Sequence, residues 1–198
     1  MQYESFFYQQ KLQRIGVFGL HPHAGVTWIT ILLAEYLANI CGLKMAVIEN
    51  SQKRDLVCLS SNKKQPEEEP FKVHKVTYSL LGEKLLMNKF NQVSYDCLVY
   101  DLGCNYAKSR DFILTCNKTL FLYKMTPWYL NQSKVESILE RDYGRLEHVI
   151  FLGNMVTKEG RKLAGKLFKN SEFLGYEPDC FHPSRQSIQV FHNILWNY

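Results

Sequence analysis

Short apolar segments alternate along the chain with longer segments in which apolar residues recur every three or four positions. The short segments are rich in β-branched and aromatic residues, as buried strands are, and the longer ones have the spacing of helices packed on a sheet. The predicted strands are residues 14–18, 45–48, 97–100, 119–123 and 148–152, and the predicted helices are residues 27–41, 80–90, 128–141 and 158–168. This alternation predicts an α/β fold: a three-layer, doubly wound, mostly parallel sheet.

Three further segments complete the pattern. Residues 72–77 alternate apolar and polar positions, which predicts an edge or shorter strand. Residues 60–70 hold three glutamates, two lysines and two prolines, so we expect a mobile surface loop there. Residues 187–198 are amphipathic at helical spacing, but their polar face lacks lysine and arginine, which favours core packing or a partner groove over a membrane surface.

Composition limits the number of domains and the classes of partner. A chain of 198 residues that is 46% hydrophobic fills one core, so we expect a single domain over residues 1–198. The net charge of +5 permits a nucleic-acid partner without requiring one. Six cysteines without a C-x-x-C pair, no signal-peptide pattern and no apolar run of membrane-spanning length together predict a cytoplasmic protein that is not an integral membrane protein.

The candidate chemistry lies where the first predicted strand meets the first helix. Residues 16–27 read GVFGLHPHAGVT: a strand, a glycine-bounded loop, and a threonine at the start of a helix. This layout directs backbone N–H groups and the positive end of a helix at an anion such as phosphate. A tight turn that serves only the fold would need the same glycines, so both interpretations stay open.

The loop resembles the K-G-G-x-G-K-T loop of the MinD/ParA family of P-loop ATPases (SIMIBI class), which includes the TadZ and CpaE proteins that place pili at cell poles. Gly25 and Thr27 match the final G-K-T of that motif. Val26 takes the place of the Walker lysine, and His21 that of the family's signature lysine, while proline and His23 replace the paired glycines. The resemblance therefore implies a degenerate member, a pseudo-ATPase with weak or absent nucleotide hydrolysis.

Two later strands extend the resemblance. Residues 46–51 resemble the strand that ends in D-x-D, but Ser51 stands in place of the aspartate that helps to activate water. Residues 95–103 resemble the Walker B strand, with Asp101 in the place of the metal-shell aspartate. The hydroxyl of Thr27 and Asp101 are the implied magnesium ligands, although Thr27 could instead begin the helix and Asp101 could cap the following loop. Asn154 occupies the place of a family asparagine that contacts adenine.

The resemblance implies a site for ATP or ADP with Mg²⁺, or no cofactor at all if the bulky segment 21–23 fills the phosphate space. A metal held by two loop histidines is disfavoured by the intervening proline and the lack of a third ligand nearby. The implied cofactor-binding residues are Gly19, His21, His23, Gly25, Val26, Thr27, Asp101 and Asn154.

These expectations favour a spatial-positioning or scaffolding adaptor that works with a protein partner, with a homodimer as a further arrangement. One alternative is a divergent ATPase whose lysine comes from another loop or a second chain, with Lys53, Lys108 and Lys124 as candidates. A second alternative is a DNA-binding adaptor with a basic helix, which could equally be a solvated helix face. The basic residues of that helix are Lys158, Arg161, Lys162, Lys166 and Lys169.

Overall fold

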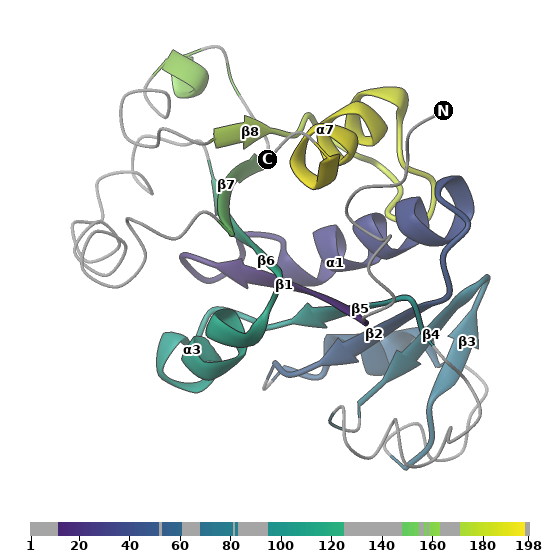
Figure 1. Ribbon diagram of the computed structural model, residues 1–198. Helices are drawn as coiled ribbons and strands as arrows, with labels where there is room; N and C mark the ends of the chain where they lie inside the picture. Colours follow the sequence, from purple (N-terminus) through teal and green to yellow (C-terminus); the bar gives the residue numbers. More distant parts are fainter. Residues whose placement is uncertain are drawn as a thin grey trace.

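The sheet forms the centre of the computed structural model and has eight strands in the order β3-β4-β2-β5-β1-β6-β7-β8 (Figure 1). All neighbouring pairs are parallel except β3 and β4. The model describes residues 12–51, 53–60, 68–80, 82, 95–124, 148–154, 157, 159–162 and 171–196. The strands are β1 (Gln13–Gly19), β2 (Met45–Glu49), β3 (Phe71–Val73), β4 (Val76–Ser79), β5 (Cys97–Asp101), β6 (Lys118–Lys124), β7 (Val149–Asn154) and β8 (Ser171–Phe173).

Helices cover both faces of the sheet, which confirms the predicted α/β fold with three layers. In Figure 1, α1 and α7 lie on one face and α3 lies on the other. The described helices are α1 (Val26–Glu35), its π-helical continuation η1 (Tyr36–Ile40), the short 3₁₀ helix η2 (Asp55–Leu59), α3 (Tyr106–Thr115) and α7 (Arg185–Trp196).

The central strands divide their side chains between two cores. All five residues of β5 are buried; Cys97 and Val99 face the core under α1 and α7, while Leu98 and Tyr100 face the core under α3. This alternation follows from the two-residue period of a strand. A strand that is covered on both faces reads as a continuous apolar run, which is why the sequence pattern locates these strands.

Helix α7 packs its apolar stripe into the first core, as predicted for residues 187–198. Phe191 and Ile194 are fully buried there. The ammonium of Lys118, at the start of β6, donates to the carbonyl oxygen of Ile194 at 2.6 Å. Burial lowers the pKa of Lys118 to about 8. The last turn of α7 is therefore held to the central sheet by a buried cation as well as by apolar contacts.

The structure corrects one predicted element and adds another. Residues 72–77 do not form one strand: β3 and β4 form an antiparallel hairpin that turns at residues 74–75, where His74 has a φ of 51°. Helix α3 is not among the predicted helices, because only Ser109 and Ile113 of its ten residues are buried and its apolar stripe is short. The predicted helix 128–141 and most of the predicted helices 80–90 and 158–168 lie outside the described residues, as does most of the predicted loop 60–70.

The arrangement of the helices defines where a ligand site belongs. Strands β1 and β5 are neighbours, yet the helix after β1 covers one face and the helix after β5 covers the other. The two connections therefore diverge at the carboxyl ends of these strands and leave a crevice between them. The loop singled out in the sequence follows β1, and Asp101 ends β5, so both lie at this crevice.

Candidate functional site

A cavity of about 290 Å³ occupies the crevice at the carboxyl ends of β1, β2 and β5. One wall is the loop after β1 with the first turn of α1. The opposite walls are the segment after β2 and the segment that leads from β5 into α3. The lining includes His21, His23, Gly25, Val26, Thr27, Ser51, Lys53, Asp101, Gly103 and Lys108.

Thr27 and Asp101 meet at the cavity, as the sequence predicts for a pair of metal ligands. The Thr27 hydroxyl donates to Asp101 Oδ2 at 2.6 Å, and the Gly103 N–H donates to Asp101 Oδ1 at 3.0 Å. Burial raises the pKa of the Asp101 carboxyl, and the hydrogen bonds from Thr27 and Gly103 oppose that rise. Gly25, not Thr27, is the N-cap of α1, so the threonine hydroxyl serves Asp101 and not the helix end.

The donor atoms at this point fit a magnesium ion. A hydroxyl and a carboxylate are hard oxygen ligands, which Mg²⁺ prefers, and Mg²⁺ commonly takes one or two such protein ligands and completes its shell with phosphate and water. Among the residues that the structure describes, no three His, Cys, Asp or Glu side chains converge on a common point. Thr27 and Asp101 therefore offer two oxygen ligands, and phosphate and water would have to complete the shell of a bound ion.

Val26, which the sequence resemblance aligns with the Walker lysine, is part of the core. Its side chain is 9% exposed, and a Cβ added at Gly19 would lie 2.8 Å from Val26 Cγ2. The valine thus packs back over the end of β1, in a space that only a glycine at position 19 leaves open. No positive charge enters the cavity from this position of the loop.

The end of β7 fixes the middle of the loop. Gly25 has a φ of 93°, and a Cβ at this position would lie 2.5 Å from Asn154 Nδ2. Asn154, which is 7% exposed, donates from that Nδ2 to the Ala24 carbonyl oxygen at 3.0 Å. The structure therefore places Asn154 behind the loop as a support for its backbone; its predicted contact with adenine stays a prediction.

His21 joins the loop to the end of β6. Its Nε2 accepts from the Lys124 backbone N–H at 2.9 Å, so the proton of the neutral ring is on Nδ1, which donates to the Pro22 carbonyl oxygen at 2.9 Å. Burial lowers the pKa of His21, and the neighbouring Lys124 adds to this effect. Both nitrogens are occupied within the loop and its neighbour, which leaves His21 without a free electron pair for a metal.

His23 and Trp28 border a second cavity of about 310 Å³ on the other side of Gly25. His23 is exposed and has a φ of 63°, a left-handed conformation that is uncommon for residues other than glycine. Trp28 is 39% exposed and Tyr176, across the second cavity, is 74% exposed. The first turn of α1 thus separates two cavities, one lined by the acidic end of β5 and one bordered by exposed aromatic rings.

The segment after β2 is folded tightly around Glu49. Ser51 Oγ donates to Glu49 Oε1 at 2.9 Å, and the Leu56 N–H donates to Glu49 Oε2 at 3.2 Å. Burial raises the pKa of Glu49 above its ordinary value, and the nearby Asp101 adds to the rise. Ser51, which the sequence resemblance aligns with the family's second aspartate, therefore donates to a neighbouring carboxylate and carries no charge of its own.

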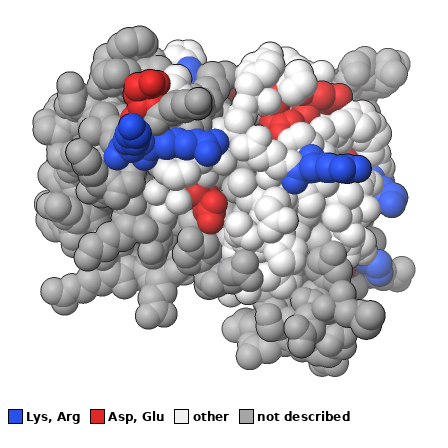
Figure 2. Space-filling model, turned by 90° about the horizontal axis from the view of Figure 1, so that it is seen from above, with Lys and Arg blue, Asp and Glu red and all other residues white. Residues whose placement is uncertain are grey.

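The three candidate lysines divide between the cavities. Lys53 and Lys108 line the first cavity, and Lys124 lines the second. Of the predicted basic helix, Arg161 and Lys162 are exposed on a helical segment at residues 159–162, and the other three basic residues lie outside the described residues. Figure 2 shows separate patches of positive charge, without a continuous stripe, on the described part of one face.

The sequence analysis missed the residues that shape the wall between β5 and α3. Asn105 is the N-cap of α3 and accepts from the Lys108 N–H, and the buried Ser109 hydroxyl donates to the Leu102 carbonyl oxygen at 2.7 Å. An asparagine directly before the first residue of a helix is a recognisable N-cap signal. The signal was missed because helix α3 is largely polar and shows no clear apolar stripe in the sequence.

The site and the sheet together define a P-loop type of α/β protein, and comparison with solved structures narrows the class to the ParA/MinD fold. The sequence matches no protein-family model and no curated protein. A plasmid partition protein of Borrelia burgdorferi bound to AMPPNP is similar with a TM-score of 0.65 and 13% identity over 93% of this chain and 97% of that one.

Two MinD structures extend this comparison. MinD of Aquifex aeolicus, in complex with MinC, has a TM-score of 0.62 and 15% identity over 94% of this chain and 96% of that one. The septum site-determining protein MinD of Pyrococcus horikoshii, complexed with Mg-ADP, has a TM-score of 0.58 and 12% identity over 93% and 95%. In the described part of this chain, no helix is both long and apolar enough to cross a membrane.

Proposed function

We propose that this chain is a nucleotide-binding adaptor with the ParA/MinD fold, which takes ATP or ADP with Mg²⁺ and hydrolyses ATP weakly or not at all. The observation that carries the proposal is the contrast at the first cavity. Thr27 and Asp101 are paired at 2.6 Å and keep the metal-binding half of the site. The loop positions that would carry two lysines instead hold a buried valine and a neutral, hydrogen-bonded histidine.

The residues of the site act on the ligand as follows. The N–H groups of the first turn of α1 have no partners within the helix, so they can donate hydrogen bonds to phosphate oxygens in the cavity. Thr27, in the same turn, and Asp101, at the end of β5, would hold the metal. A bound Mg²⁺ would supply charge neutralisation between the phosphate groups.

Slow turnover follows from how the segment after β2 uses its polar side chains. An attacking water needs a group that orients it, and the place of the family's water-activating aspartate is taken by Ser51, whose hydroxyl donates to Glu49. Glu49 is itself 7% exposed and accepts two hydrogen bonds within its own segment. Neither residue is arranged to take a proton from water, so occupancy and not turnover is the signal in this proposal.

The output of the adaptor is a protein contact. In the Aquifex complex, MinD is bound to MinC, and the same fold in this chain presents exposed aromatic rings beside the loop. Trp28 lies in the first turn of α1 and borders both cavities. A ligand at either cavity therefore changes what surrounds this ring, and a partner or a second copy of the chain could detect that change.

Calorimetric titration with ATP and ADP in magnesium buffer tests the proposal, with Thr27→Val and Asp101→Asn as variants. We expect the wild type to bind nucleotide, and each variant to bind it about tenfold or more weakly because a charged or metal-bound contact disappears. We expect phosphate release from ATP at the rate of the buffer alone. Phosphate release that Asp101→Asn abolishes would favour the divergent ATPase. If no heat is released at millimolar nucleotide, the chain does not bind nucleotide, and only a scaffolding role would remain of the proposal.

A further inference from the structure

Lys53 and Lys108 are the only lysine or arginine residues that line the first cavity within the described part of the chain. Both are exposed, and within the described residues neither forms a salt bridge. They approach from walls on the far side of the cavity from the loop, one after β2 and one at the start of α3. Two cations without partners thus converge on a cavity whose loop carries no charge of its own.

The segment that carries Lys53 is fixed on three sides. Glu49 accepts hydrogen bonds from both ends of the segment, at Ser51 and Leu56. The Asn50 N–H donates to the Asp101 carbonyl oxygen at 2.9 Å, which ties the segment to β5. A Cβ added at Gly103 would lie 3.2 Å from Ser51 Cβ, so the segment packs closely on the turn after β5. The backbone beneath Lys53 is therefore preorganised at the cavity.

Lys108 is held with similar precision. It is the third residue of α3, and its N–H donates to the N-cap side chain of Asn105 at 3.4 Å. The next residue, Ser109, is 1% exposed and bonded to the Leu102 carbonyl oxygen, which anchors the first turn of α3 to the end of β5. The direction in which Lys108 leaves the helix is thus set by buried contacts.

Electrostatics give these two lysines a role. Asp55 and Asp101 also line the cavity, so two acids and two lysines nearly cancel in formal charge and leave the helix end as the remaining attraction for an anion. Without the two lysines, a polyphosphate would meet two carboxylates and no cation from the protein.

We propose that Lys53 and Lys108 together recognise the phosphate chain of a nucleoside di- or triphosphate and replace, from the opposite walls of the cavity, the charge that the loop lacks. This inference rests on the proposed function, because it concerns the ligand of the same cavity. It goes beyond the proposed function because it assigns phosphate recognition to two lysines that lie outside the loop after β1.

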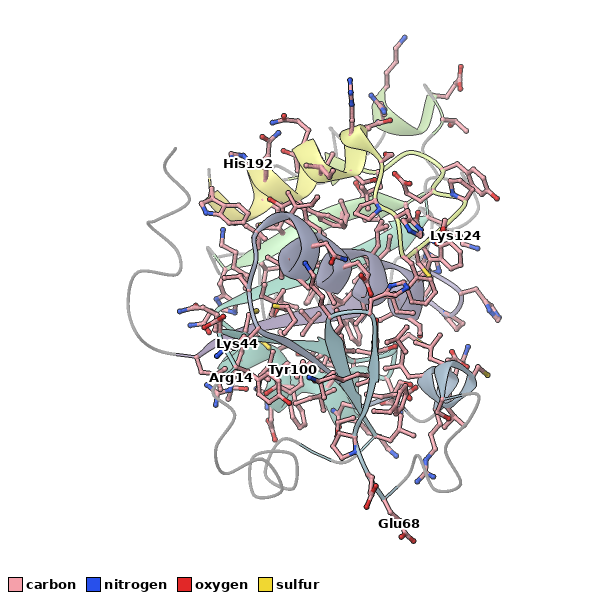
Figure 3. All side chains as sticks on the ribbon, turned by 90° about the vertical axis from the view of Figure 1, so that its right-hand side faces the viewer. Arg14, Lys44, Glu68, Tyr100, Lys124 and His192 are labelled. Atoms are coloured by element: carbon pink, nitrogen blue, oxygen red, sulfur yellow. The ribbon has the colours of Figure 1, made fainter. Side chains whose placement is uncertain are left out.

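Titration of the intact chain with Mg-ADP and with inorganic triphosphate tests this assignment, with Lys53→Met, Lys108→Met and the double variant. Lys44→Met is the matched control: Lys44 is exposed and precedes β2, and Figure 3 shows it beside Arg14 at the amino ends of the strands, away from Lys124. All single variants lose the same net charge. Because both lysines are exposed, urea unfolding should give the wild-type midpoint for each variant.

We expect each single variant to bind both probes about tenfold more weakly and the double variant about a hundredfold more weakly, as the loss of one charge-assisted hydrogen bond each implies. The dependence of affinity on salt should flatten in the same variants and not in the control. Wild-type affinity in the double variant would overturn this inference and leave the proposed function intact. Failure of the wild-type chain to bind either Mg-ADP or inorganic triphosphate at millimolar concentration would overturn both the inference and the proposed function.

Discussion

Replacing Gly25 with alanine tests whether Asn154 sets the shape of the loop. An alanine at this position adopts a φ of 93° with a Cβ 2.5 Å from Asn154 Nδ2. The left-handed conformation costs about 1–2 kcal/mol for a residue with a Cβ. The amide must also withdraw from the Ala24 carbonyl oxygen, and a buried carbonyl that loses its partner costs about 1–3 kcal/mol. We therefore expect a loss of about 3 kcal/mol in the free energy of unfolding.

Gly42→Ala provides the matched control. Gly42 has a φ of 73°, and a Cβ there would meet no atom within 4 Å. Its replacement carries the conformational cost alone, about 1 kcal/mol. Urea denaturation followed by fluorescence gives both values from the shift in midpoint at constant slope. The difference between the two variants isolates the contact with Asn154.

A double-mutant cycle with Asn154→Ala completes the test. Once the amide is absent, Gly25→Ala should cost no more than Gly42→Ala, which corresponds to a coupling of about 1–2 kcal/mol between positions 25 and 154. Equal costs for Gly25→Ala and Gly42→Ala in the wild-type background would refute the reasoning. So would a cost for Gly25→Ala that is the same with and without Asn154, since the loop would then owe its shape to something else.

Three other predictions concern buried polar groups. Because the pKa of Lys118 falls from 10.5 to about 8 on folding, the unfolded chain binds more protons between those values, so wild-type stability should rise with pH across that window relative to Lys118→Met in urea unfolding. His21 also has a lowered pKa, so the stability of the wild type should fall as the pH drops through about 6.5. The variant His21→Gln can still accept a hydrogen bond from the Lys124 N–H, so it should not lose stability in this way. Thermal melts at pH 5 and pH 7.5 measure the difference. Ser109→Ala should lower the free energy of unfolding by about 1 kcal/mol, and the exposed Thr115→Ala, which also loses a hydroxyl bonded to a helix carbonyl, should change it by less than half as much; equal effects would contradict the role of burial.

The sheet could be predicted because each central strand is recognisable from a short apolar run in the sequence. β5 is apolar at four successive positions and is buried on both faces, so its location needs no knowledge of its neighbours. The hairpin of β3 and β4 was harder, because a turn at His74 needs a left-handed residue and histidine is not a usual signal for one.

The site was predictable in part, for a similar reason. Thr27 and Asp101 follow strands whose carboxyl ends meet at one edge of the sheet, so their proximity follows from the fold. The hydrogen bonds that hold the loop do not, since His21 bonds to a residue 103 positions later and Asn154 to one 130 positions earlier. Such long-range pairs depend on side-chain geometry that no local pattern encodes.

The two supports behind the loop have a consequence for how the protein could signal. His21 and Asn154 fix the loop to the ends of β6 and β7 through contacts within the protein, so the loop has little freedom left to lose. A bound ligand then meets a rigid wall and gains no signal from ordering it. Any mechanical response to occupancy has to arise across the cavity, where long exposed side chains such as Lys53 give up rotamer freedom on contact. The loop would serve as the fixed wall of such a switch, and the exposed side chains across the cavity would be the part that responds.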